Sequence, residues 1–335
     1  MPSSFTSEET MAKPKLALYW AASCGGCEIA VLDTELKVLE IADFFDIVFW
    51  PCAMDFKYED VRALEDGGIT LTLFNGAIRS SENYEMAKLL RRKSKILCAF
   101  GSCASDGCIP GLANCNTLEE ILSYVYEESP STDNAERVRP RIETEVPEGT
   151  LRIPELWNTV RTLPQVVDVD YIIPGCPPQP DQIKVVVDAV ISILKGEAPL
   201  PPQGTILGAT ARACCEECPR QRDVKKIKSF VRPHEVVPDP DVCLLEQGII
   251  CMGPATRGGC GAKCVKAGVP CRGCYGLPSD VHDQGAKMIA ALAGVIDSED
   301  PEEIDRILSG ISDPVGTFYR FSLPHSTLRR RQVQV

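Results

Sequence analysis

Residues 15–27, KLALYWAASCGGC, decide how the N-terminal half of the chain folds. The apolar run KLALYW (15–20) predicts a buried strand, and the two cysteines after it, Cys24 and Cys27, stand in a glycine-bearing turn. Residues 28–42 then carry apolar side chains at helical spacing. The stretch therefore predicts a strand, a cysteine-bearing turn and a helix, which is the first unit of an alternating α/β fold.

Further apolar runs along the chain repeat this unit. They predict strands over residues 46–50, 69–74, 95–100 and 169–174, and helices over residues 82–92 and 181–194. Strands that alternate with helices form a parallel sheet with right-handed crossovers. We therefore expect a flavodoxin-like α/β domain over residues 13–196. An N-terminal extension (1–12) would precede it, and a small, irregular, cysteine-rich domain (197–335) would follow it.

Composition excludes several classes of protein. A net charge of −12 argues against a nucleic-acid partner, because binding to phosphate rests on Lys and Arg. No apolar run reaches the ~18–20 residues that span a bilayer, and residues 1–12 lack the basic and apolar parts of a secretory signal. We therefore expect a cytoplasmic protein without a membrane anchor, in which 17 cysteines indicate metal or redox chemistry and not disulfides.

Cysteines follow three of the predicted strands. Cys24 and Cys27 follow the first strand, and Cys103 and Cys176 follow two later ones. Ligands bind at the carboxyl ends of parallel strands, near the point where the strand order reverses. A flavodoxin-like order would therefore bring these thiols into one four-cysteine site. A thioredoxin-type redox motif is the alternative for Cys24 and Cys27, but it leaves Cys103 and Cys176 unexplained.

The segment 214–274 holds nine cysteines in 61 residues. Setting Cys214 aside leaves eight thiols, enough for two four-cysteine sites, and such soft ligands suit zinc, copper(I) or iron–sulfur clusters. A zinc ribbon spaces its CxxC pairs by roughly 15–20 residues, whereas 52 residues separate Cys218 from Cys271. Zinc therefore stays possible on the chemistry of the thiols, but the spacing of the cysteines favours iron–sulfur clusters.

For the remaining cysteines and for Glu28, a structural role is the favoured interpretation. The cysteines outside these sites are interpreted as buried and inert: Cys52, Cys98, Cys108, Cys115 and Cys214. Glu28, beside Cys27, is interpreted as a helix-start glutamate favoured by the helix dipole, with a role in proton movement as the alternative. Residues 109–164 are too long for a plain loop, and we expect them to fold over the cysteine-bearing edge of the sheet.

Together the cysteine motifs resemble the small, electron-transferring subunit of cytoplasmic [NiFe]-hydrogenases. The motifs are CGGC at 24–27, GSCA at 101–104, PGCPP at 174–178, CEECP at 215–219 and PCRGC at 270–274. The segments ASCGGCE (22–28) and IPGLAN (109–114) are most similar to the small subunit of the hydrogenase associated with heterodisulfide reductase. This is the viologen-reducing type of methanogenic archaea and related anaerobes. The nearest alternative is the small subunit of cytoplasmic NAD(P)- or sulfur-linked hydrogenases.

The resemblance implies three [4Fe-4S] clusters as cofactors. The proximal cluster would be held by Cys24, Cys27, Cys103 and Cys176, the medial cluster by Cys260, Cys264, Cys271 and Cys274, and the distal cluster by Cys215, Cys218, Cys243 and Cys251. The best-known periplasmic members have a histidine at the position of Cys215, and a proline is frequent at that of Cys264. Thiolates there add negative charge, which predicts lower reduction potentials.

The resemblance also implies the partners. A large subunit would carry the Ni-Fe site that oxidises H2, and it would form an obligate, apolar interface at the loops that bear the proximal ligands. Electrons would leave through an iron–sulfur adaptor subunit to heterodisulfide reductase, for flavin-based electron bifurcation. The chain shows no substrate-transforming residues of its own. An alternative of a different class is a zinc-binding or ferredoxin-like scaffold without a hydrogenase partner.

Overall fold

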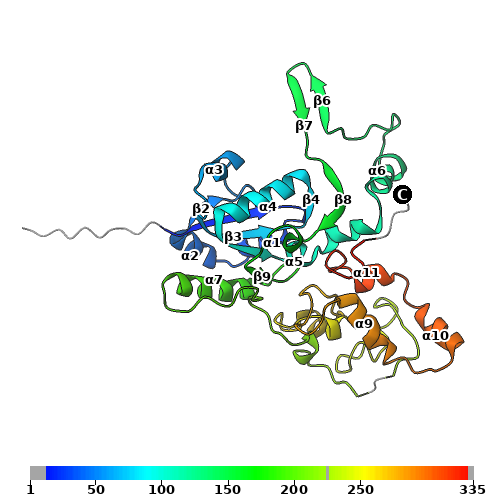
Figure 1. The fold of residues 1–335 in the computed structure, drawn as a ribbon. Coiled ribbons are helices and arrows are strands. Elements are labelled where there is room, and N and C mark those ends of the chain that lie inside the picture. Colours follow the sequence, from blue (N-terminus) through cyan, green and yellow to red (C-terminus); the bar gives the residue numbers. More distant parts are fainter. Residues whose placement is uncertain (1–12, 224–225, 331–335) are drawn as a thin grey trace, which may run out of the picture.

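The computed structural model describes residues 13–223 and 226–330, so the expected extension over residues 1–12 lies outside it. Five parallel strands form a sheet with the order β2-β1-β3-β5-β9 (Figure 1). This is the flavodoxin-like order, which confirms the predicted α/β class. The strands are β1 (Lys15–Trp20), β2 (Asp46–Phe49), β3 (Ile69–Asn75), β5 (Ser94–Phe100) and β9 (Tyr171–Ile173).

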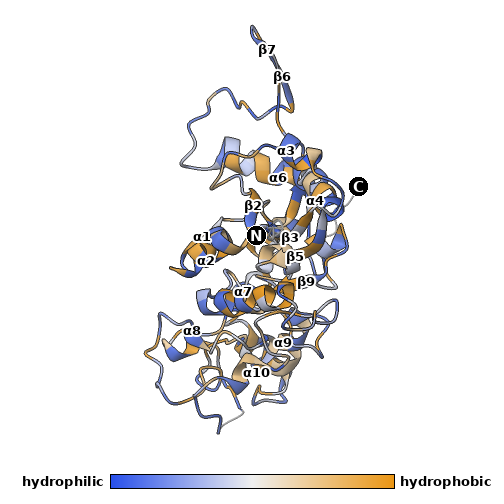
Figure 2. Ribbon diagram, turned by 90° about the vertical axis from the view of Figure 1, so that its left-hand side faces the viewer, coloured by the Kyte–Doolittle hydropathy of each residue, from blue (hydrophilic) through white to orange (hydrophobic). Residues whose placement is uncertain are grey.

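Helices cover both faces of the sheet. Successive side chains of a strand point to opposite faces, so Ala17 and Tyr19 lie in one buried cluster and Leu16 and Leu18 in another. Figure 2 shows apolar residues of the sheet and of α7 in orange. The first cluster is covered by α3 (Tyr58–Ala63) and α4 (Ser81–Lys93), the second by α1 (Gly26–Leu32), α2 (Lys37–Phe44) and α7 (Pro180–Leu194).

The single helix predicted over residues 28–42 is wrong, because the structure has the two short helices α1 and α2 there. Between them, the hydroxyl of buried Thr34 donates a 2.6 Å hydrogen bond to the carbonyl of Val31. Such a local bond competes with the helical pattern. Glu35 then lies in the left-handed region, at φ 60°, where a right-handed helix cannot continue.

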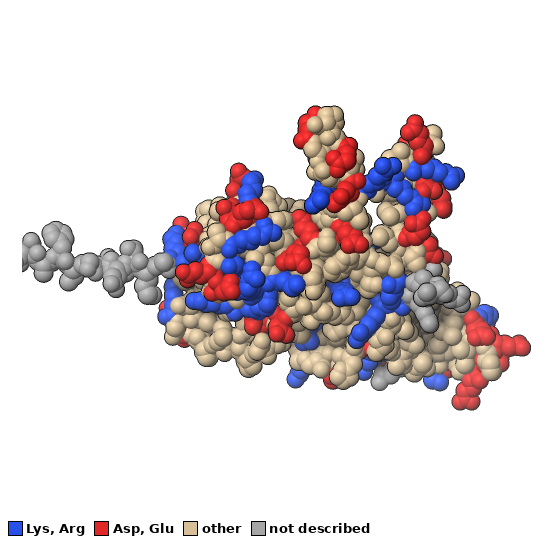
Figure 3. Space-filling view, turned by 45° about the horizontal axis from the view of Figure 1, so that its top comes forward, with Lys and Arg blue, Asp and Glu red and all other residues tan. Residues whose placement is uncertain are grey.

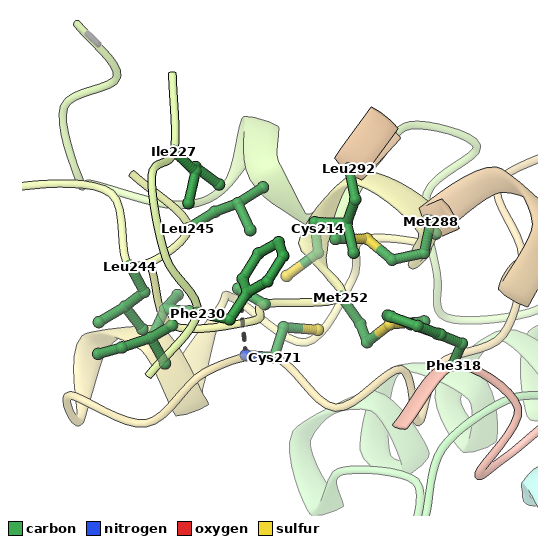
Figure 4. Packing of buried hydrophobic residues seen from close by; sticks show 14 of the residues in the cluster. Cys214, Ile227, Phe230, Leu244, Leu245, Met252, Cys271, Met288, Leu292 and Phe318 are labelled. Carbon is green, nitrogen blue, oxygen red and sulfur yellow. Dashed lines mark hydrogen bonds between the residues drawn. The ribbon is translucent and has the colours of Figure 1, made fainter. Parts of the chain in front are cut away.

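The C-terminal half is largely irregular, as predicted, and is packed around its cysteines. Its apolar core joins Cys214 and Cys271 to Met252, Met288 and Phe318 (Figure 4). Its regular elements are short: η4 (Cys214–Glu216), η5 (Gly253–Ala255), α8 (Lys263–Lys266), α9 (Gln284–Ala293), α10 (Pro301–Leu308) and α11 (Pro314–Phe318). No helix within the described ranges is long and apolar enough to cross a membrane.

Residues 109–164 form two parts. The first, η1 (Ile109–Cys115) and β8 (Leu156–Arg161), lies against the sheet domain, where β8 pairs with β4 (Ile78–Ser80) and η3 (Leu163–Gln165) follows it. The second, α6 (Leu118–Ser123), η2 (Tyr124–Glu128) and the hairpin β6 (Glu143–Val146)–β7 (Gly149–Arg152), extends away (Figure 1). Acidic side chains stand on this hairpin (Figure 3). The expectation that the whole segment folds over the edge is therefore wrong for the hairpin.

Candidate functional site

The four thiols predicted for the proximal site, here the proximal group, come together in the structure. They stand after β1, β5 and β9, whose carboxyl ends meet because the strands are parallel and neighbouring. The thiols of Cys103, Cys176 and Cys24 all act electrostatically on that of Cys27. Burial, followed by these neighbours, raises the pKa of Cys27. Cys24 alone is exposed, so the group opens to the surface on the side of the first loop.

Glycine brings the backbone close to this group. Gly101, between β5 and the short helix α5 (Ser102–Asp106), has φ +81°, and a Cβ added there would lie 2.3 Å from the Cys27 sulfur. The Gly101 N–H donates to the Ile173 carbonyl at 2.8 Å, and the Ser102 N–H donates to the Gly175 carbonyl at 2.8 Å. These bonds hold the loops that carry Cys103 and Cys176 side by side.

A later segment, residues 319–329, packs against the loop that follows Cys103. A Cβ added at Gly107 or Gly111 would lie 2.3 or 2.4 Å from the ring of Pro324, so only glycine admits that proline. The Gln165 side chain donates to the Pro324 carbonyl at 2.7 Å, and the ring Nδ1 of His325 lies 3.1 Å from a carboxylate oxygen of Asp106. The loop that follows Cys103 is therefore packed against residues distant in sequence.

The other eight thiols form a medial and a distal group. In the medial group, burial is the main factor that raises the pKa of Cys274. The nearby thiols of Cys260, Cys264 and Cys271 raise it further through electrostatic repulsion. In the distal group, burial is the main factor that raises the pKa of Cys215, to about 12. The thiols of Cys243 and Cys218 add electrostatic repulsion in the same direction. The distal thiols line a cavity of about 460 Å³: Cys215, Cys218, Cys243 and Cys251, together with Cys214 and Cys271.

Hydrogen bonds and an electrostatic interaction link the three groups in series. Cys274 of the medial group is influenced by Cys176 of the proximal group, and the Ser102 hydroxyl, beside Cys103, donates to the Cys274 carbonyl. On the other side, the Cys271 N–H donates to the Cys251 sulfur at 3.3 Å (Figure 4). The order along the molecule is therefore proximal, medial, distal.

Thiols and glycines of this kind fit iron–sulfur clusters. Each group offers four thiols, the ligand set that a [4Fe-4S] cluster takes. A side chain at Gly101 would occupy the space beside the Cys27 thiol. A Cβ added at Gly253 would likewise lie 2.8 Å from the Cys215 sulfur. In the part of the chain that the structure describes, no set of three or more His, Cys, Asp or Glu residues is arranged to hold a single metal ion.

The interpretation of five cysteines as buried and inert needs correction. Cys98 is buried in the sheet core, as predicted, and Cys115 is half-buried against the C-terminal core. Cys52 is exposed. Cys108 is fully buried with its sulfur 3.6 Å from that of Cys176, and Cys214 hydrogen-bonds to Cys260 and Cys271. The nearness of Cys108 to Cys103 in sequence was the one available signal.

These added thiols change the acidity of their neighbours. The hydrogen bond from Cys108 lowers the pKa of Cys176 to about 7, against the effect of burial. The hydrogen bond from Cys214 lowers the pKa of Cys271 to about 7 and that of Cys260 to about 6. Thiolates are the form in which cysteine binds metal, so both contacts favour the ligand form of the cysteines they touch.

Glu28 is more deeply placed than a helix-start glutamate needs to be. It is only 4% exposed, and its carboxylate accepts hydrogen bonds from the Trp50 indole and from the Cys52 thiol, the latter at 3.6 Å. Burial raises the pKa of Glu28, and the hydrogen bond from Trp50 partly opposes that shift. A buried carboxyl group therefore lies next to Cys27 in sequence, and its hydrogen-bond partners Trp50 and Cys52 come from a different loop.

Comparisons with known proteins agree with the cysteine pattern. Residues 24–190 match the family described as NADH ubiquinone oxidoreductase, 20 Kd subunit. The chain is 38% identical, over 95% of its length and 98% of the relative's, to the iron-sulfur subunit of the F420-non-reducing hydrogenase of Archaeoglobus profundus. It is 37% identical, over 93% and 95%, to an F420-non-reducing hydrogenase subunit of Methanothermobacter thermautotrophicus. A solved NAD+-reducing [NiFe]-hydrogenase is 28% identical over 57% of this chain and 96% of that chain, with a TM-score of 0.46.

Proposed function

The chain belongs to the iron–sulfur subunits of the F420-non-reducing hydrogenases, small subunits of [NiFe]-hydrogenases, and from this we propose that it conducts electrons through three [4Fe-4S] clusters. It is a subunit of an oxidoreductase, and a hydrogenase small subunit works with a large subunit. The observation that carries the proposal is the serial arrangement of the three thiol groups. The Ser102 hydroxyl, beside Cys103, donates to the Cys274 carbonyl, and the Cys271 N–H donates to the Cys251 sulfur.

The protein's part in this conduction is to fix and insulate the clusters. The proximal group would hold the first cluster, the medial group the second and the distal group the third. When bound, such clusters supply one-electron redox chemistry. The chain supplies their order and their surroundings: Cys103, Cys251 and Cys271 are buried, and apolar packing around Met252 and Phe318 keeps water from the middle of the series.

The large subunit would dock where the proximal group reaches the surface. Cys24 is exposed, and so are several large apolar side chains near it in sequence. Exposed apolar patches mark protein–protein interfaces, and obligate interfaces are the more apolar ones. These exposed side chains are Trp20, Ile29, Leu32, Leu36, Leu39 and Met54. Ile29 and Leu32 belong to α1, and Leu36 and Leu39 lie at the start of α2; both helices are at the left of Figure 2. Electrons from the Ni-Fe site would therefore enter at Cys24.

Electrons would leave at the distal group. Cys215, Cys218 and Cys243 are each only half-buried, so this end of the series lies close to the surface. We further propose, on the resemblance of the motifs, that an iron–sulfur adaptor subunit docks there and passes electrons to heterodisulfide reductase for bifurcation. The proposed setting is the cytoplasm of a methanogen or a related anaerobe.

The deciding experiment is metal analysis of the hydrogenase complex purified without oxygen. We expect about twelve iron and twelve sulfide per chain, four for each cluster, with a nickel-bearing partner and a paramagnetic signal after reduction. Cys176→Ser should lose about four iron, whereas Cys98→Ser, a buried cysteine of the sheet core, should lose none. About four iron with bound zinc in the wild type would refute the three-cluster proposal.

A further inference from the structure

Cys108 is a fifth thiol at the proximal group. It is fully buried, and its sulfur lies 3.6 Å from the Cys176 sulfur and hydrogen-bonds to Cys103 as well. Its backbone has φ 44°, in the left-handed region that a residue with a side chain rarely adopts. The Cys108 N–H donates to the Phe321 carbonyl at 3.1 Å, and the side chain of Phe321 packs against it. The surrounding structure therefore holds this thiol in a strained conformation that places it against two proposed ligands.

Cys214 occupies the corresponding place at the medial group. It precedes the distal residue Cys215 in sequence, yet its thiol hydrogen-bonds to Cys260 and Cys271. It is 3% exposed, and its N–H donates to the Thr256 carbonyl at 2.7 Å. Figure 4 shows Cys214 and Cys271 in the same packed cluster. Two sites thus repeat one arrangement, four proposed ligands and one added thiol that touches two of them.

A thiol placed this way acts on the cluster through its ligands. A thiol is a weak hydrogen-bond donor, and a bond to an ionised acceptor is stronger than a bond to a neutral one. Reduction of a cluster adds negative charge, which the ligand sulfurs share. A donor to those sulfurs therefore stabilises the reduced state more than the oxidised state, and hydrogen bonds to sulfur are among the factors that set the potential of a cluster.

We propose that Cys108 and Cys214 are positioning thiols that donate S–H···S hydrogen bonds to the ligands of the proximal and medial clusters and raise the reduction potentials of these two clusters. This inference rests on the proposed function. The all-thiolate ligand sets alone predict low reduction potentials. These donors offset part of the negative charge of the ligands and therefore raise the potentials of the proximal and medial clusters from those low values. Two sites of the series are thereby adjusted independently, each by one residue that is not itself a ligand.

The test is a redox titration of the reduced-cluster signals in the purified complex, followed by electron paramagnetic resonance. In Cys108→Ala we expect a lower midpoint potential for the proximal cluster alone, and in Cys214→Ala a lower one for the medial cluster alone. Iron and sulfide should stay at the wild-type content in both. Cys108→Ser, which keeps a hydroxyl donor, should return the proximal potential toward the wild-type value.

Cys98→Ala is the matched control, because Cys98 is as deeply buried, within β5, and its thiol donates to the backbone carbonyl of Ala99 at 3.9 Å and not to a proposed ligand. It should shift no potential. Wild-type midpoints in both alanine variants would overturn the inference, and so would a loss of about four iron from either, since the residue would then be a ligand. A wild-type complex with far fewer than twelve iron would instead refute the proposed function.

Discussion

At the scale of single residues, Gly101 is the position where backbone freedom matters most. An added Cβ would lie 2.3 Å from the Cys27 sulfur, and φ +81° is a strained value for any other residue. We expect Gly101→Ala to displace the Cys27 thiol, to lower bound iron and to destabilise the protein by about 1–3 kcal/mol. Iron analysis and thermal unfolding of the purified complex would measure both effects.

Gly196 offers a control for that substitution. Its φ of +77° is close to that of Gly101, but no atom lies within 4 Å of an added Cβ. Gly196→Ala should therefore carry only the backbone cost, about 1–2 kcal/mol, and keep all of its iron. Equal iron loss in the two variants would mean that the contact with Cys27 is not what matters at Gly101.

The sequence predicted which cysteines gather but not all that surrounds them. Motif spacing and the strand pattern were sufficient to place Cys103 and Cys176 beside Cys24 and Cys27, because parallel strands end at a common edge. The position of Cys108 depends on Phe321 and Pro324, which come from a distant segment. Burial created by such long-range packing leaves no local pattern in sequence, and the same is true of Glu28.

At the scale of elements, the sheet could be predicted and the first helix could not. Each strand is an apolar run bounded by turn residues, and this signal is independent of the rest of the chain. The apolar spacing of residues 28–42 is equally regular, but the Thr34 hydroxyl and the left-handed Glu35 interrupt it. Periodicity reports which face is apolar and does not report where the backbone changes direction.

The segment 319–329 contributes a pH-dependent contact to the fold. The hydrogen bond with Asp106 raises the pKa of His325, although the side chain is 46% exposed. A raised pKa in the folded state means that this stabilisation is complete below the unfolded value of about 6.5 and is lost as pH rises through the folded value. We expect His325→Gln to unfold at a lower temperature than the wild type in mild acid, with the difference vanishing in alkaline buffer.

A double-variant cycle isolates this pair. Asp106→Asn should show the same loss in mild acid, and the double variant should lose less than the sum of the two, because they remove one shared interaction. Thermal unfolding over a pH series would measure the four proteins. Strictly additive losses would show that His325 and Asp106 act separately, and a difference that grows with pH would reverse the sign argued here.

At the scale of the whole molecule, the exposed apolar face around α1 and α2 is the docking surface that we propose for the large subunit. Leu36 and Leu39 are 77% and 61% exposed, so a change to lysine costs the isolated subunit little. In the complex it would bury an unpaired charge. We expect Leu36→Lys and Leu39→Lys to weaken binding of the large subunit roughly tenfold or more. Retention of the nickel-bearing subunit on the tagged chain would measure it.

Val237 is a suitable control, because it is also apolar and is 98% exposed but lies in the C-terminal half. Val237→Lys should retain the large subunit as the wild type does. If all three variants retain it equally, the docking face lies elsewhere on the molecule. If Val237→Lys alone loses it, the large subunit binds the C-terminal half.

The packing of residues 319–329 on the loop that follows Cys103 has a consequence for biosynthesis. A ribosome delivers the chain from its N-terminus, so Cys24 and Cys27 emerge long before Pro324 can meet Gly107 and Gly111. Until then the loop behind Cys103 lacks its cover. The loop that follows Cys103 therefore reaches its final packing only after residues 319–329 have been synthesised, later than the sheet whose strands carry the proximal thiols.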